Sequence, residues 1–143
     1  MDRLIMEVFV NIDEEHIVEL DSPIGHVTMI PFGGTVKGEL FHGVIAPGGA
    51  DTQVTNQNGV CHMSARYMLV GQDKTGKDCH IYVENNGWFT SDSNPGPFKT
   101  VPTFITDSTA LAPYLHTNQF RGEGHADENG LVIRFYEISR RSD

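Results

Sequence analysis

Cysteine is scarce in this chain of 143 residues, which contains only Cys61 and Cys79. Two cysteines do not make the disulfide framework that holds many small secreted domains together. A chain of this length buries roughly 68–70% of the surface that it exposes when unfolded, so a hydrophobic core is sufficient. We therefore expect one domain over residues 1–143, with both thiols reduced.

Basic residues are also few, since 10 Lys and Arg stand against 19 Asp and Glu, and the formal net charge is −9. Nucleic-acid binding needs a dense cationic surface, and no Lys/Arg cluster occurs outside Arg140-Arg141. The same charge disfavours docking on an anionic membrane. The sequence thus predicts neither a nucleic-acid partner nor a membrane partner.

Long hydrophobic runs are absent. Glu7 interrupts the apolar N-terminus too early for the core of a secretory signal. No segment approaches the ~20 apolar residues of a membrane-spanning helix. We therefore expect a cytoplasmic protein.

Recognisable metal and phosphate motifs are missing as well. His116, Glu123 and His125 lie close in sequence, but no helical or hairpin register brings all three to one metal ion. The Gly48-Gly49 pair is followed by neither the Lys nor the helix of a phosphate-binding loop. We predict no metal and no cofactor.

What the sequence does have is period-two alternation, which indicates strands. Turn signals such as Asn58-Gly59, residues 73–77 and Asn129-Gly130 separate these strands. The expected strands span residues 4–11, 16–20, 25–32, 36–46, 61–70, 79–85, 99–106, 118–124 and 131–138. A bend at 31–34 should end the third of them. Residues 86–97 read as a loop, and 107–116 as the place of one short helical turn.

Such regularly spaced short strands are typical of a sandwich or a barrel. Gly38 and Gly43 lie inside one expected strand, where glycine suits the strong curvature of a barrel. We therefore predict an all-β protein: a single antiparallel up-and-down barrel like those of lipocalins and streptavidin. It should have about eight to ten strands and at most one short helix, with room inside for one small ligand.

The hairpin of residues 61–85 carries most of the candidate site. Its odd-numbered face is apolar except at Asn85 and the hydroxyl of Tyr67, so it should face the core. Its even-numbered face carries Arg66 and Tyr82. We expect these two residues to pair across the strands, with an error of two residues in the register. That face either meets water or lines a pocket or subunit interface, where Arg66 would bind an anionic or carbonyl oxygen.

Three other residues each have two interpretations. Asn85 either ties down the following turn or orients a ligand, because a buried amide needs hydrogen-bond partners. Asp51 either caps its own glycine turn or acts as a general base at the rim of the barrel. Trp88 is either an exposed loop residue or part of a lid over the mouth.

The chain also resembles a known family at specific residues. These are Gly33-Gly34, Gly38, Leu40, Gly43, residues 47–51 (Pro-Gly-Gly-Ala-Asp), residues 65–67 (Ala-Arg-Tyr), residues 81–83 (Ile-Tyr-Val), Asn85, Gly87, residues 102–104 (Pro-Thr-Phe) and residues 135–137 (Phe-Tyr-Glu). They are similar to the family called domain of unknown function 3237, or uncharacterised protein family 0311. The resemblance implies a small antiparallel β-barrel and no established reaction. Two positions depart from the family pattern: Thr52, often aromatic there, and Ser64, often Asp.

Two functions follow from these expectations. In the first, the barrel binds a small organic molecule through Tyr67, Tyr82, Asn85 and Trp88. It could also perform cofactor-free acid–base chemistry on a carbonyl or phenolic compound, with Asp51 and Arg66 as catalytic residues. In the second, the barrel is structural and self-associates into a homo-oligomer without a ligand. The sequence does not decide between them, nor whether the protein is an enzyme.

Overall fold

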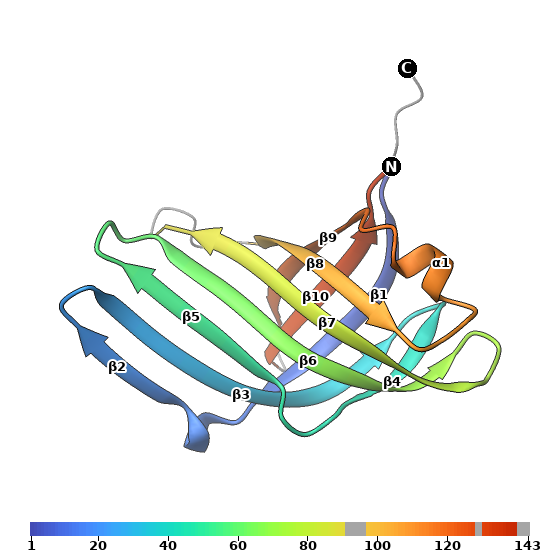
Figure 1. Ribbon diagram of the computed structural model, residues 1–143, viewed down its shortest axis with the longest axis horizontal. Helices are drawn as coiled ribbons and strands as arrows, with labels where there is room; N and C mark the ends of the chain where they lie inside the picture. Colours follow the sequence, from blue (N-terminus) through green and yellow to red (C-terminus); the bar gives the residue numbers. More distant parts are fainter. Residues whose placement is uncertain (91–96, 128–129, 140–143) are drawn as a thin grey trace.

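The computed structural model describes residues 1–90, 97–127 and 130–139, which form ten strands and very little helix (Figure 1). The strands are β1 (Arg3–Ile12), β2 (Val18–Ser22), β3 (Gly25–Lys37), β4 (Phe41–Ile45), β5 (Ala50–Asn56), β6 (Cys61–Asp73), β7 (Asp78–Phe89), β8 (Phe98–Thr106), β9 (Phe120–Asp127) and β10 (Gly130–Glu137). The helix α1 (Ala112–Leu115) is one turn long, and η1 (Glu14–His16) is a 3-10 turn. No helix among the described residues has the length and apolar character needed to cross a bilayer.

The sheet closes on itself. All pairings are antiparallel, and the order β1-β10-β9-β8-β7-β6 continues through β4 and β5 to β3. Strands β4 and β5 share one position, because each pairs with β3 and with β6. Pairing of β1 with β3 completes an eight-position barrel, while β2 extends the sheet along the free part of β3. The predicted antiparallel barrel with one short helix is therefore confirmed.

The expected long strand over residues 36–46 is wrong. The chain leaves β3 after Lys37 and reverses before β4 begins at Phe41. Gly38 lies at this reversal, and a Cβ built there would be 2.3 Å from the carbonyl oxygen of Ile5. Glycine is needed because the backbone of β1 approaches too closely for a side chain.

The bend expected at residues 31–34 does not end a strand either. Strand β3 runs through it, and Gly34 pairs with Val10 of β1. Gly34 has φ +140°, and a Cβ there would be 1.9 Å from the carbonyl oxygen of Phe9. The glycine thus permits close contact between β3 and β1 rather than a turn. The second expected strand also begins later, at Val18, because η1 precedes it.

The loop expected over residues 86–97 is shorter than predicted. Strand β7 continues to Phe89, and Gly87 pairs with Met63 inside the sheet. A Cβ at Gly87 would be 3.0 Å from the carbonyl oxygen of Lys99, so this glycine also serves close strand packing. Residues 91–96 of the expected loop lie outside the described residues, as does Asn129 of the expected last turn.

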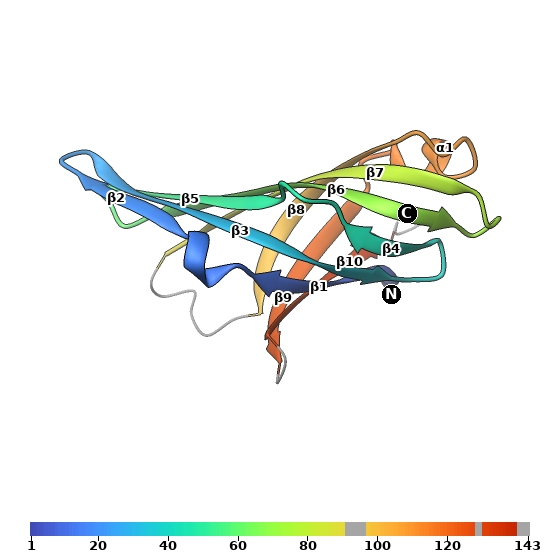
Figure 2. The ribbon, with the colours of Figure 1, turned by 90° about the horizontal axis from the view of Figure 1, so that it is seen from below.

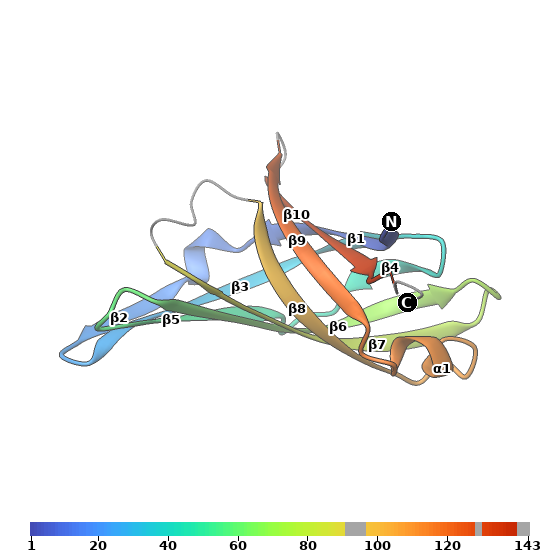
Figure 3. The same ribbon diagram turned by 90° about the horizontal axis from the view of Figure 1, so that it is seen from above.

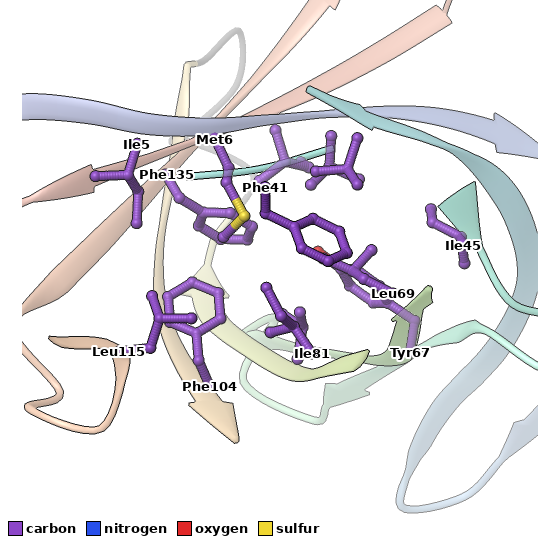
Figure 4. Close-up of a cluster of buried hydrophobic side chains, with 14 of the residues drawn as sticks. Ile5, Met6, Phe41, Ile45, Tyr67, Leu69, Ile81, Phe104, Leu115 and Phe135 are labelled. Carbon is purple, nitrogen blue, oxygen red and sulfur yellow. The ribbon is translucent and has the colours of Figure 1, made fainter. Parts of the chain in front are cut away.

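The packed core fills the half of the barrel that lies next to α1. Large side chains from β1, β4, β7, β8 and β10 meet there, as the close-up of the buried cluster shows (Figure 4). Phe104 contacts both Phe120 and Phe135 edge to face, with ring centroids 5.4 and 5.2 Å apart. Leu111 and Leu115 from the α1 segment are also fully buried in this cluster. The same strands continue past this core toward the other half of the barrel.

Candidate functional site

The half of the barrel away from α1 is hollow. A cavity of about 580 Å³ lies between β3, β5, β6 and β7 on one side and the ends of β1, β8 and β10 on the other. This volume falls within the range of about 300–1,000 Å³ typical of small-molecule sites. Most of its wall is apolar, through Val10, Ile12, Ile30, Phe32, Met63, Phe89, Phe98, Leu131 and Ile133.

Strand register brings three polar side chains to this wall. Asp51 pairs with Ala65, which in turn pairs with Asn85, so the three residues form one row across β5, β6 and β7. The Cα atoms of Asp51 and Asn85 are thus separated by two strand spacings, roughly 10 Å. Tyr67 lies two residues beyond Ala65 on β6 and therefore faces the same side. The small Ala65 leaves the space between them open.

Five described side chains have a buried polar atom without a hydrogen-bond partner, and these three of them line the cavity. Oδ1 of Asp51, the hydroxyl of Tyr67 and Oδ1 of Asn85 are all buried without a hydrogen-bond partner among the described residues. Only 5% of Tyr67 and 2% of Asn85 is exposed. An unsatisfied buried polar group costs about 1–3 kcal/mol, so these three atoms are the strongest hydrogen-bonding positions of the cavity wall.

Burial also changes how two of these groups ionise. It raises the pKa of Asp51 above its ordinary value, and the hydrogen bond that Gln53 Nε2 donates to Asp51 Oδ2, 2.9 Å long, offsets part of this rise. Burial raises the pKa of Tyr67 well above the usual range, so its hydroxyl stays protonated. The cavity therefore contains one carboxyl group that resists ionisation and one permanently protonated phenol.

The structure does not bring the other predicted residues to the cavity. Arg66, Tyr82 and Trp88 lie on the outer, even-numbered face of the hairpin. The pairing of β6 with β7 differs by two residues from the expected pairing of Arg66 with Tyr82, which is within the expected error of two residues. Arg66 therefore pairs with Glu84 instead of Tyr82, with 3.7 Å between Nε and Oε1.

Two consequences follow for the expected roles. The side chain of Arg66 is 65% exposed, so it does not reach a ligand in the cavity. Trp88 belongs to β7 and not to a loop, so it is no lid. Its neighbour Phe89 points the opposite way and lines the cavity.

Several residues of the cavity wall were not predicted from the sequence, because they come from strands that are distant in the chain. Gln53 carried a usable signal, since it lies two residues after Asp51 and so shares its face. Phe98 carried none. Its ring covers Gly124 of β9, where a Cβ would be 1.9 Å from Cζ, and it contacts Phe89 edge to face at 5.6 Å. This aromatic pair joins the wall at β7 and β8 only after the barrel closes.

The described lining of the cavity contains an acidic side chain and no basic one. Asp51 is the only ionisable carboxylate in its described lining, and no Lys, Arg or His lies there. Among the described residues no three His, Cys, Asp or Glu side chains are grouped so as to hold a metal ion. What the arrangement offers is hydrogen bonding by a carboxyl, a phenol and an amide within an apolar enclosure.

A small antiparallel β-barrel that is packed at one end and hollow at the other is therefore the class of protein that these features define. The family model described as protein of unknown function, DUF3237, matches residues 3–138, and the chain belongs to this family. A curated relative, a UPF0311 protein of Clostridium acetobutylicum, is 29% identical over 150 residues, covering 94% of this chain and 92% of its own.

Solved structures show the same fold. A protein of unknown function from Clostridium acetobutylicum is 31% identical, with a TM-score of 0.77 over 97% of this chain and 98% of that one. A β-barrel-like protein from Acinetobacter baumannii matches with a TM-score of 0.73 at 23% identity, over 95% and 94% of the two chains.

The two departures from the family pattern lie outside the cavity. Thr52 and Ser64 pair with each other across β5 and β6, on the outer face of the sheet. The residues that form the polar row inside the barrel, Asp51 and Asn85, match the pattern. The departures therefore alter the outer surface and leave the polar row unchanged.

We expect Gly124→Ala to destabilise the protein by about 1–3 kcal/mol, because the added methyl group displaces the ring of Phe98. Gly33→Ala is the matched control, since nothing lies within 4 Å of a Cβ at that position. Urea unfolding of both variants measures the difference. Equal midpoints would show that Phe98 does not rest on Gly124.

We expect Asp51→Asn to be more stable than the parent protein at neutral pH. Because the folded-state pKa of Asp51 is raised, ionisation favours the unfolded chain as pH rises from its ordinary value of 3.8 through the raised value. The parent loses stability across this window, and the loss is complete above it. Urea unfolding at a series of pH values should show a flatter profile for the variant. A parallel profile would mean that Asp51 is not desolvated.

Proposed function

We propose that the protein binds a small organic molecule in the hollow half of its barrel. The molecule has an apolar body that fits against the aromatic and aliphatic wall. It also has at least one polar group that hydrogen-bonds with Asp51, Tyr67 and Asn85. The observation that carries this proposal is the convergence of three buried, unpartnered polar atoms on one apolar cavity.

Unsatisfied hydrogen-bonding groups in the cavity support this proposal. Protein interiors leave few buried polar groups unpaired, and those that exist are met by water or by a ligand. Water can occupy the polar row, but it forms no hydrogen bonds with the phenylalanine and isoleucine side chains elsewhere in the cavity. A ligand with both apolar and polar parts satisfies the row and also removes apolar wall from water.

Charge narrows the class of molecule. An anionic ligand would meet the carboxylate of Asp51 with no cation in the described lining to compensate, in a chain of net charge −9. Uncharged compounds with a hydroxyl or a carbonyl group avoid this repulsion. A phenolic hydroxyl can donate to Asp51 or Asn85, and a carbonyl oxygen can accept from Tyr67.

The same three groups support cofactor-free acid–base chemistry on a carbonyl or phenolic compound. Asp51 takes a proton from the substrate, which its raised pKa favours by making it a stronger base than an ordinary aspartate. The Tyr67 hydroxyl donates a hydrogen bond to the oxygen that gains negative charge, and Asn85 orients the substrate. Arg66 has no part in this chemistry, because it faces solvent.

A thermal-shift screen of uncharged phenols and ketones tests binding. A compound present at 100 times its dissociation constant should stabilise the parent protein by ~2.7 kcal/mol. Tyr67→Phe should weaken its binding by about fivefold, since one hydrogen bond contributes ~1 kcal/mol. Tyr82→Phe is the control and should bind as the parent does, because Tyr82 is on the outer face. The carboxylate analogue of the best compound should bind less well.

Two results would contradict the binding proposal: no compound in the screen shifts the melting temperature, or the Tyr67→Phe and Tyr82→Phe variants bind identically. For a ketone that binds, proton NMR in D₂O then tests the chemistry. The parent should exchange the protons next to the carbonyl group, and Asp51→Asn should not. Binding without exchange would leave a binding protein and remove the catalytic part.

A further inference from the structure

The outer face of the sheet carries exposed apolar side chains and no charged ones along two rows that cross strands β2, β3, β5, β6, β7 and β8. Register places one row of side chains across five strands, with Leu20, Val27, Val54, His62 and Trp88 in that order. The adjacent row contains Val18 and Met29 at one end, the uncharged polar residues Thr52, Ser64 and Asn86 in the middle, and Val101 at the other end. We call the exposed apolar members of these rows the outer apolar face: Val18, Leu20, Met29, Val54, Trp88 and Val101.

This surface is open to solvent in the described chain. Its six members are between 41% and 69% exposed. Strands β9 and β10 curve away from the layer on its other side, and α1 lies at its far end (Figures 2 and 3). Scattered exposed apolar residues are ordinary, but six of them gathered on two neighbouring uncharged rows mark an interaction surface.

Trp88 is preorganised at one end of the row. Its indole ring stacks on His62 with ring centroids 4.6 Å apart and planes 4° apart. A ring nitrogen of His62 lies 3.1 Å from Oδ1 of Asn86, which fixes the imidazole beneath the indole. Little side-chain freedom is therefore lost when a partner covers Trp88, the property of a strong interface anchor.

Charge argues that the partner is a second copy of this chain. The two rows contain no Asp, Glu, Lys or Arg, although the chain has 19 acidic residues and a net charge of −9. Glu19 and Asp21 of β2 belong to the opposite face, as the pairing of Glu19 with Thr28 and Gln53 shows. Two copies of this anionic chain would repel each other across most of their surface, but the two rows contribute no charge to that repulsion.

Shape agrees with self-association. Two identical sheets have the same twist, so their faces pack in the aligned arrangement of a β-sandwich. The two rows across five strands span on the order of 300 Å². A standard protein interface buries about 800 Å² on each partner, so the face forms the apolar centre of the interface, and the next outward row, with Arg66 and Glu84, belongs to its polar rim.

We propose that two copies of this chain form a two-fold symmetric dimer through the outer apolar face, with Trp88 as its anchor. The row of apolar side chains of one copy packs against the same row of the other, as a symmetric interface requires. The cavity lies on the opposite side of the same strands. The dimer is therefore independent of the proposed ligand, and either proposal can fail alone.

Analytical ultracentrifugation of the full chain over a range of concentrations tests the dimer. The parent should approach twice its mass of 15.8 kDa as concentration rises. Met29→Lys should raise the dimer dissociation constant at least about tenfold, because it places two like charges in an apolar interface. Leu4→Lys is the matched control, since Leu4 is 41% exposed on β1 outside this face, and should associate as the parent does.

Trp88→Ala is a second variant that adds no charge and should also weaken the dimer. Far-ultraviolet circular dichroism and cooperative urea unfolding verify that each variant is folded. Added salt should strengthen the dimer, because it screens the repulsion between two anionic chains. A parent that stays monomeric at every concentration, or equal effects of Met29→Lys and Leu4→Lys, would overturn the proposal. So would a monomer that binds uncharged phosphatidylcholine vesicles, since the face would then serve a lipid surface.

Discussion

Pairing between β1 and β3 is the interaction on which the rest of the structure depends. Six residue pairs, from Glu7 with Lys37 to Ile12 with Phe32, join the two strands and close the sheet. Closure gives every strand an inside and an outside, and the two-residue period then assigns each side chain to one of them. Without this seam Asp51, Tyr67 and Asn85 would lie on an open sheet in contact with water. Their missing hydrogen bonds would then have no significance.

The two halves of the barrel differ in how completely the inward side chains fill the interior. Near α1 the interior receives Phe41, Phe104 and Phe135, which fill it. At the other end the inward positions of β5 and β6 leave a cavity unfilled; they hold Asp51, Gln53, Thr55, Cys61, Met63 and Ala65. The same β-barrel thus has a packed core that stabilises it at one end and a cavity at the other. Tyr67, which contacts Phe32 edge to face at 5.2 Å, stands at the boundary between them.

Much of this arrangement could be predicted from the sequence, because alternation and turn residues are local signals. The odd-numbered face of the β6–β7 hairpin was correctly assigned to the interior, which placed Tyr67 and Asn85 with the core. Arg66 and Tyr82 were grouped with Asp51 although they lie on the even-numbered face, because the pattern of one hairpin does not show whether a pocket or a subunit covers its outer face. Glycines misled at two positions. Gly34 and Gly87 suggested a bend and a loop, and each lies inside a strand and permits close approach between neighbouring backbones, whereas Gly38 does lie at a chain reversal.

The central claim is that the inner face of β5, β6 and β7 contains a carboxyl group desolvated by an apolar cavity. Titration of the Asp51 side-chain carboxyl by ¹³C NMR tests it most directly, with Asp51→Asn providing the resonance assignment. The account predicts a pKa above the ordinary value of 3.8. A pKa at or below 3.8 would mean that Asp51 is solvated or paired, and that the hollow half of the barrel is not the environment described here.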